Sequence, residues 1–343
     1  MTYTENGTIK NFKRGDEIRV PDAEADNGYT FYKLYALTTE SSVTTAIWDK
    51  LGAGGSANPN ETVNISLTQI GGNSADLIGA SITITDDYTG DTLLTAIWNG
   101  STITTDIPMG AYYTVSVETI VGYLACADQS YLAGYQTTRN ISFEYKALGA
   151  YIEATDGTLY TASSWSGSGK TANAIVLITG TDSNKNLRIG LEIAKKKMHS
   201  GATASLRNYL TIYDTAVSAA NDFDGVGNTD KIISFNAANG TNTTTYAAPW
   251  AKAYTFADGT HIGFIPSMGQ LVLIYNNITA ITNAFSALNI TLPSDTYYYS
   301  STLGPHPQGN DNPWEKNIIT GQDWNWGTEW DYYVLPICEY NIV

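Results

Sequence analysis

Hydrophobic side chains recur at every second position along several short segments between residues 63 and 145. This is the pattern of β-strands that bury one face and expose the other. Turn residues separate the segments, for example Gly71–Gly72 and Asn99–Gly100, the second pair having the chemistry of a tight hairpin turn. Many short strands without a helix predict a β-sandwich. The alternating residues are Val63, Ile65, Leu67, Ile82, Ile84, Tyr113, Val115, Val117, Ile141, Phe143 and Tyr145.

One later segment, residues 263–288, has a helical period instead. Ser267 and Gln270 have the spacing of a capping box, which satisfies backbone N–H groups at the start of a helix. The pair Asn276–Asn277 can divide the segment into two shorter helices. We expect this segment to form the layer behind the C-terminal sheet. Its apolar stripe, at spacings of three and four, is Leu271, Ile274, Tyr275, Ile278, Ile281, Phe285 and Leu288.

The composition of the chain narrows its class and its partners. Charged residues make up 15%, well below the usual quarter, and 24 tyrosines favour strands. The formal net charge of −15 predicts no nucleic-acid partner, because phosphates would be repelled. No apolar run is long enough for a membrane span, and the N-terminal residues lack the hydrophobic stretch of a secretory signal. We therefore expect neither a membrane span nor a secretory signal.

Three regions follow from these patterns. Residues 1–58 hold too little apolar surface for a core of their own and end in a Gly/Ser/Asn/Pro-rich linker, so we interpret them as an attachment region. Residues 59–147 are the Ig-like β-sandwich. Residues 148–343 combine a hairpin closed at Asp156–Gly157, a buried strand and several helices. The predicted fold class is mainly β with an α+β C-terminal domain.

The residues that could carry metal or catalytic chemistry form no recognisable motif. The acidic, glycine-rich stretch 222–230 offers oxygen ligands of the kind that calcium prefers, but its spacing departs from the EF-hand loop. Capping of the next helix by Asn228 or Thr229 is the simpler interpretation. We expect no enzyme activity, no catalytic residues, no metal and no cofactor. The histidines, which are far apart in the sequence, are His199, His261 and His306.

The tail from residue 297 to residue 333 is rich in Tyr and Trp, interleaved with Gly, Asn, Asp and Gln. Some rings belong to the core, because Tyr333, Leu335 and Ile337 alternate as in a terminal strand. The other rings lie in loop-like sequence, where rigid aromatic and adaptable polar groups mix as in a binding surface. Ordinary packing stays open as the alternative. The candidate ligand-binding residues are Tyr297, His306, Asn310, Asp311, Asn312, Trp324, Asn325, Trp326 and Trp330.

The third region, from about residue 149, resembles a C-type-lectin-like domain of Bacteroidales and their phages, related to the formylglycine-generating-enzyme type of lectin fold. The landmarks of the resemblance are, in order, GAYIEATDGTLYTASSW, DFDGVGNTDKI, GFIPSMGQLVLIYNN, YYYSST and YYVLPI. The chain departs from the family pattern at Gln270, Tyr299 and Leu335, where an acidic residue, Trp and Arg are usual. Residues 61–147 look like the Ig-like or Cna-B-like spacers that precede such tips.

The resemblance implies that the terminal strands of this domain pair and that helices pack behind a small sheet. It also implies that the segment between the last two landmarks forms an exposed face. In the variable proteins of diversity-generating retroelements, which look similar in layout, that face is the ligand surface. The Glu-Pro-Asn signature of calcium-dependent animal lectins is absent, so calcium-dependent sugar binding is not expected.

These observations lead us to expect a phage virion protein, in a tail or head fibre, whose tip adheres to a glycan or protein on the host cell surface. Residues 1–58 would dock other virion proteins, and a homo-oligomer such as a trimer would bind by avidity. The expected location is the virion surface. A bacterial surface adhesin or pilus-tip protein, located on the bacterial cell surface, is one alternative. A structural virion decoration protein without a ligand is another.

Overall fold

The computed structural model describes most of the chain in two compact units, residues 1–146 and 147–343, and each is described here by itself. Among the described residues, those up to Phe31 and those from Tyr35 to Gly52 are described by their backbone alone, and the same holds for Pro108 and Asp311. The described residues are 2–5, 8–11, 17–21, 29–40, 43–52, 60–87, 89–108, 111–133, 138–166, 168–180, 182–199, 206–240, 242–294, 297–305, 311–325 and 330–341.

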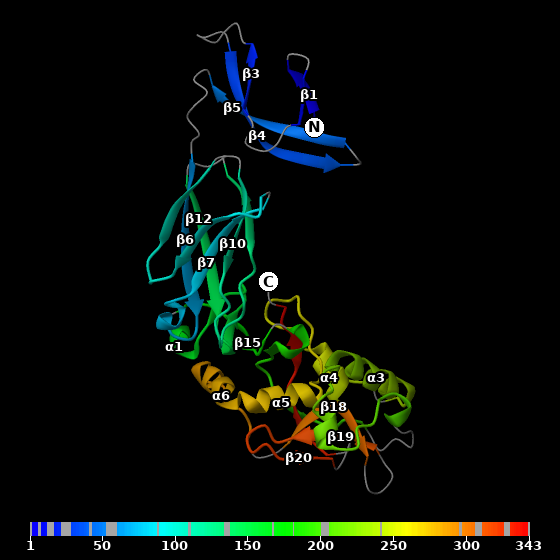
Figure 1. The fold of residues 1–343 in the computed structure, drawn as a ribbon. Coiled ribbons are helices and arrows are strands. Elements are labelled where there is room, and N and C mark those ends of the chain that lie inside the picture. The colour runs from blue at the N-terminus through cyan, green and yellow to red at the C-terminus, as the bar shows by residue number, and fades with distance from the viewer. Residues whose placement is uncertain are drawn as a thin grey trace. The chain divides into compact units, whose positions relative to one another are not determined.

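The first unit begins with two antiparallel sheets (Figure 1). Five strands lie within residues 2–52, while most of the predicted linker, residues 53–59, lies outside the described residues. The attachment role of this region stays a prediction. The strands are β1 (Thr2–Glu5) with β2 (Thr8–Asn11), and β3 (Glu17–Pro21), β4 (Tyr29–Glu40) and β5 (Val43–Gly52) in that spatial order.

The rest of the first unit is the predicted sandwich, built from a four-stranded sheet (order β11-β10-β7-β8) and a three-stranded sheet (order β12-β6-β9). The alternating residues lie inside it, and ten of the eleven are buried, Val117 being half-buried. A short 3₁₀ helix, η1 (Ser74–Leu77), follows the first strand. The strands are β6 (Asn60–Ile70), β7 (Ser81–Asp86), β8 (Thr92–Ile97), β9 (Ile103–Pro108), β10 (Tyr112–Val117), β11 (Gln129–Leu132) and β12 (Thr138–Lys146).

The turn at Asn99–Gly100 corrects one prediction. It joins β8 to β9, which belong to different sheets, so it is a corner of the sandwich and not a hairpin turn. Asn99 Oδ1 accepts the backbone N–H of Ser101 at 3.0 Å, and Gly100 has φ of 93°. This Asx-type turn can redirect the chain from one layer to the other. The Asn-Gly pair therefore predicted the position of the turn correctly, but the turn does not connect two paired strands as expected.

The first and last strands of the sandwich, β6 and β12, pair in parallel. Their register runs from Thr62 opposite Thr138 to Ile70 opposite Lys146. The chain therefore enters this pair at one end of the strands and leaves it at the other, roughly 25–30 Å away at 3.3 Å per residue.

The second unit contains two five-stranded sheets. The first has the order β14-β13-β15-β16-β22 and the second β17-β21-β18-β19-β20. The hairpin at Asp156–Gly157 is confirmed by the pairing of β13 with β14. The strands are β13 (Gly149–Ala154), β14 (Leu159–Tyr160), β15 (Ala172–Ile178), β16 (Leu187–Ile189), β17 (Ala194–Lys196), β18 (Tyr298–Pro305), β19 (Asp311–Lys316), β20 (Asp323–Trp324), β21 (Tyr332–Val334) and β22 (Ile337–Glu339).

The C-terminal residues differ from the prediction in two ways. Tyr333 and Ile337 do not share one strand, since β21 and β22 lie in different sheets with Leu335–Pro336 between them. A proline cannot donate to a strand ladder, which ends β21 here. The first and last strands of the unit also do not pair, because β15 and β16 separate β13 from β22.

The helical layer behaves as the sequence predicts. Asn277 separates α5 from α6, and Gln270 Oε1 accepts the Ser267 N–H at 2.9 Å. The stripe residues Leu271, Ile281 and Phe285 are fully buried in the core with the sheet. Within the described ranges, no helix combines the length and apolar character needed to cross a bilayer. The helices, of which Figure 1 labels α1, α3, α4, α5 and α6, are α1 (Ala162–Trp165), η2 (Ser183–Lys185), η3 (Leu206–Asn208), α2 (Ala216–Ala219), α3 (Gly225–Ala238), α4 (Ala247–Ala253), α5 (Met268–Asn276) and α6 (Ile278–Ala287).

Candidate functional site

Four aromatic residues lie in or next to strands of the second sheet of the C-terminal unit, and we call them the aromatic surface: Tyr297 directly before β18, Trp324 in β20, Trp330 two residues before β21, and Tyr332 in β21. The ring centroid of Tyr297 lies 6.2 Å from that of Trp324 and 5.9 Å from that of Tyr332. Trp324 is 39% exposed and Trp330 is 58% exposed. The two tyrosines are half-buried. The Trp324 indole therefore faces solvent beside the Tyr297 phenol, and Trp330 exposes a second indole on the segment that leads into β21.

A tight turn presents Trp324. After β19 the chain folds back on itself, and Asn317 Oδ1 accepts the N–H groups of Ile319 and Thr320 at 3.0 and 2.9 Å. Gly321 follows with φ of 80°, a conformation that favours glycine. This local hydrogen bonding is the chemistry by which Asn forms turns, and it leads directly into β20.

Two tethers flank Trp324 in the sequence. Before it, the Lys316 ammonium pairs with the Asp323 carboxylate at 2.7 Å, and only 5% of the lysine side chain is exposed. After it, Asn325 Nδ2 donates to the carbonyl oxygen of Pro305 at 2.7 Å, at the end of β18. Both neighbours of Trp324 are thus bound to the sheet. A ring held in this way loses little conformational entropy when a ligand covers it.

Beneath the surface the aromatic packing continues into the core. Tyr299 is fully buried, its ring lies 5.2 Å from that of Tyr332, and its hydroxyl donates to the Trp330 carbonyl at 2.7 Å. Burial, and then the nearby Glu315 carboxylate, raises the pKa of Tyr332 to about 12. The same causes raise the pKa of Tyr297. Both phenols therefore stay neutral hydrogen-bond donors at ordinary pH.

The structure places the other predicted ligand-binding residues unevenly. His306, Asn310 and Trp326 lie outside the described residues, and Asp311 is described by its backbone alone, at the start of β19. Asn312 was expected on the exposed face, but its side chain is buried, on β19 opposite Gly304 of β18. Asn325 is half-buried and takes part in the Pro305 tether, which makes it a positioning residue.

The acidic stretch 222–230 is engaged within the protein. Asp224, and not Asn228 or Thr229, caps α3, because its Oδ1 accepts the Gly227 N–H at 2.9 Å. Asp222 is buried, and its Oδ2 accepts from Asn228 at 2.8 Å and from Thr302 at 2.7 Å. Among the described residues, His, Cys, Asp and Glu form no group of three or more that could hold a metal ion. The cap formed by Asp224 and the buried hydrogen bonds of Asp222 give these acidic residues a structural role.

One carboxylate–imidazole pair has the composition of a catalytic dyad. His261 Nδ1 lies 2.7 Å from Asp258 Oδ2, and its Nε2 lies 3.1 Å from Arg188 Nη1. A guanidinium only donates, so Nε2 accepts and Nδ1 carries the hydrogen. Burial opposes ionisation of Asp258, but the N–H groups of Thr260 and His261 outweigh it and lower the pKa of the carboxyl. With its lone pair occupied, His261 is not positioned as a general base. The absence of enzyme activity stays a prediction.

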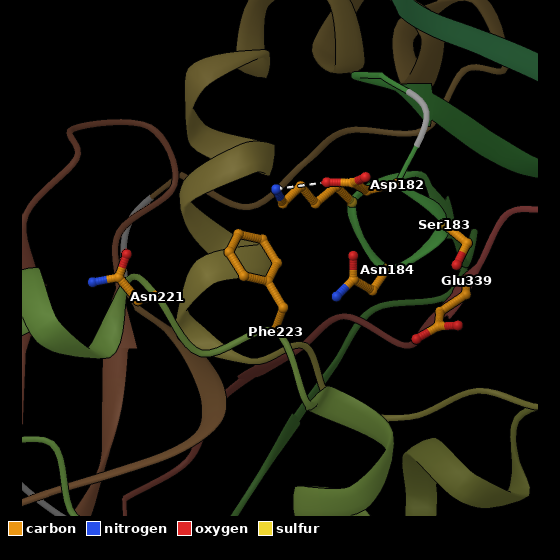
Figure 2. A pocket seen from close by; sticks show the side chains of 7 residues that line it. Asp182, Ser183, Asn184, Asn221, Phe223 and Glu339 are labelled. Carbon is orange, nitrogen blue, oxygen red and sulfur yellow. Dashed lines mark hydrogen bonds and ion pairs between the residues drawn. The ribbon is translucent and has the colours of Figure 1, made fainter.

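An open pocket of about 870 Å³ in the same unit was not predicted. Figure 2 shows Phe223 and Asn221 on one side of it and Asn184 on the other. The Lys185 ammonium pairs with Asp182 at 2.8 Å and lies 5.4 Å from the centroid of the Phe223 ring. A face of that ring already carries the protein's own lysine, so the aromatic surface is the stronger candidate for ligand binding. The pocket is lined by Asp182, Ser183, Asn184, Lys185, Asn221, Phe223 and Glu339.

No family model and no curated protein matches the chain. Among solved structures it is similar to a fimbrial protein from Bacteroides ovatus, with 10% identity over 94% of this chain and 79% of that chain, at a TM-score of 0.42. It is also similar to the minor pilin GBS52 of Streptococcus agalactiae (11% identity, 37% and 63% coverage, TM-score 0.23). A third is the pilus backbone RrgB of Streptococcus pneumoniae (9%, 62% and 50%, TM-score 0.20). At these scores the likeness carries no functional argument, and the C-type-lectin-like resemblance stays a prediction.

Proposed function

We propose that this chain is a surface adhesion protein of the adhesin or pilus type, and that its aromatic surface binds a carbohydrate. The observation that carries the proposal is the exposure of Trp324, in β20 of the second sheet, and of Trp330, just before β21. Exposed aromatic rings that gather on one part of a protein surface are typical of a binding site. Trp324 and Tyr332 lie on strands, which hold a site more accurately than loops do.

A carbohydrate suits the chemistry of this surface. The apolar face of a sugar ring can stack on an indole, and sugar hydroxyls can accept from neutral phenols. Tyr297 and Tyr332 supply such donors, because their pKa values are raised. Since neither group ionises near neutrality, we expect binding to be constant between pH 6 and pH 9. A single weak site of this kind gains strength from several copies acting together.

The strand order of the sandwich supports the role of an extended surface protein. Because β6 and β12 are parallel, the chain enters and leaves this module at opposite ends. Such a module carries a chain outward without returning it to its starting point. A virion fibre needs the same property, so this argument does not separate a bacterial surface protein from the phage virion protein predicted from the sequence. The localisation test below separates the two.

The test measures adhesion of the full-length chain to Bacteroidales cells and to an array of capsular and mucin-type glycans. We expect Trp324→Ala and Trp330→Ala each to reduce binding at least tenfold without lowering the melting temperature. The control is Tyr112→Ala, which removes a 37% exposed ring from β10 in the other unit. Wild-type binding by both tryptophan variants would disprove the proposal.

Pretreatment of the cells separates the ligand classes. Periodate, which cleaves vicinal diols, should abolish adhesion, whereas protease treatment should leave it unchanged. The opposite result would reassign the aromatic surface to a protein ligand. Immunogold labelling of intact cells and of purified phage particles then identifies the carrier, and we expect label on the bacterial surface.

A further inference from the structure

The β6–β12 pair has the geometry of a joint loaded in shear. The chain enters β6 at Asn60 and leaves β12 at Lys146, at opposite ends of a parallel pair nine residues long. Tension along the chain pulls β6 toward its beginning and β12 toward its end. The paired positions must then fail together, because the strands slide past one another and do not separate one pair at a time.

A buried ion pair lies at the end where β6 begins. The Arg139 guanidinium on β12 binds the Glu61 carboxylate on β6, whose side chain is fully buried. In the register Arg139 faces Val63, so Glu61 is already two positions nearer the start of β6. Tension moves Glu61 farther in that direction. Sliding by even one residue, about 3.3 Å, would separate two charges inside the protein, which is strongly unfavourable.

Polar side chains on β6 add contacts across the same joint. Asn64 Nδ2 donates to Asn140 Oδ1 at 3.0 Å. The Ser66 hydroxyl on β6 donates to the Ile141 carbonyl on β12 at 3.5 Å, and the Thr68 hydroxyl donates to the Phe143 carbonyl at 3.4 Å. Each of these hydrogen bonds joins one position on β6 to one position on β12. Sliding of β6 along β12 therefore breaks all of them.

The other edge of β12 is covered by the segment 124–129. Carbonyls at alternate positions of β12 point away from β6, and three of them accept hydrogen bonds from this segment. An edge strand with such cover is protected against pairing with another chain and against peeling from its own sheet. The three bonds run from Gln129 Nε2 to Ser142 at 3.1 Å, from Cys126 Sγ to Glu144 at 3.7 Å and from the Leu124 N–H to Lys146 at 2.9 Å.

We propose that the sandwich has a second function, bearing tension along the chain, and that β6 and β12 form its load-bearing joint. The proposed adhesion supplies the tension, because a tethered protein that holds a ligand is pulled at both ends. The resistance itself belongs to the sandwich. An assay without ligand therefore tests it separately, and its failure would leave the proposed binding function intact.

The experiment stretches the full-length chain in optical tweezers through DNA handles on introduced cysteines, after Cys126→Ser and Cys338→Ser. Handles at Asn60→Cys and Lys146→Cys load the joint in shear. Handles at Asn60→Cys and Thr138→Cys pull on the same end of the two strands and unzip them. We expect a several-fold higher rupture force in shear, with a length release of about 30 nm for the extended segment.

Two further variants test the ion pair in the shear geometry. Arg139→Met should lower the rupture force, whereas Glu144→Gln, which removes an exposed charge from the same strand, should not. Equal rupture forces in the two pulling geometries would overturn the proposal. So would an Arg139→Met variant that, once shown by circular dichroism to be folded, ruptures at the wild-type force.

Discussion

Removal of Arg139 should destabilise the sandwich far more than removal of an ordinary surface charge. Its side chain is 17% exposed and that of Glu61 is fully buried, so Arg139→Met leaves a carboxylate in the interior without its arginine. Breaking a buried ion pair by removing one partner costs about 3–5 kcal/mol. The arginine also lies 4.6 Å from the centroid of the Tyr131 ring and donates to the Leu132 carbonyl at 3.3 Å, and both contacts are lost as well.

Hydrogen exchange followed by mass spectrometry measures this loss within the sandwich alone. A fall of about 3–5 kcal/mol in the free energy of opening corresponds to amide exchange that is roughly a hundred to several thousand times faster. The acceleration should be confined to peptides from the sandwich, residues 60–146. Peptides from β15, in the other unit, serve as the internal control and should exchange at the wild-type rate.

A double variant shows whether the destabilisation comes from the missing ion pair itself or from the unpaired buried carboxylate that the single variant leaves behind. When Glu61 and Arg139 are both replaced by Met, no unpaired charge stays in the interior, and the free energy of opening should return to within about 1 kcal/mol of wild type. The reasoning is refuted if Arg139→Met accelerates exchange less than tenfold, or if the double variant is as unprotected as the single one.

Three further outcomes concern the second unit. Phe285→Ala, at a fully buried ring in α6, should lower its free energy of unfolding by about 3–5 kcal/mol, measured by urea titration. Gly321→Ala should lower the free energy of unfolding by about 1–3 kcal/mol, because φ is 80° and the new Cβ would lie 2.4 Å from the Tyr275 ring. The same variant should weaken glycan binding, and unchanged binding would show that the turn does not position Trp324. The pKa of Tyr332 is raised to about 12, whereas an unfolded tyrosine titrates near 10. Its stabilising contribution is therefore complete below about pH 10 and is lost as the pH rises to about 12, a slope in the melting temperature that Tyr332→Phe should reduce.

Local patterns were enough to predict the sandwich strands and the helical segment. Alternation identified the sandwich strands because a half-buried strand repeats its environment at every second residue. The division of the helical segment at Asn277 was also visible, since the capping chemistry is local. Exposure of Trp324 and Trp330 followed from aromatic residues placed in sequence that is rich in turn formers.

The pairing of elements could not be predicted in the same way. The turn at Asn99–Gly100 reads as a hairpin turn, yet it connects two sheets, because strand partners are chosen by contacts distant in sequence. The burial of Asn312 goes with the pairing of β19 with β18, in which Asn312 lies opposite Gly304. The Glu61–Arg139 pair joins residues 78 positions apart, and neither residue stands out from its neighbours in the sequence.

The parallel pairing of β6 with β12 has a consequence for how such a protein can evolve. A module whose start and finish lie at opposite ends can be duplicated in tandem at the gene level without changing the residues on either side of it. Each added copy of residues 60–146 would extend the chain by roughly 25–30 Å, the axial span of the paired strands. The reach of such a protein can therefore be adjusted in whole steps while its terminal domain stays unaltered.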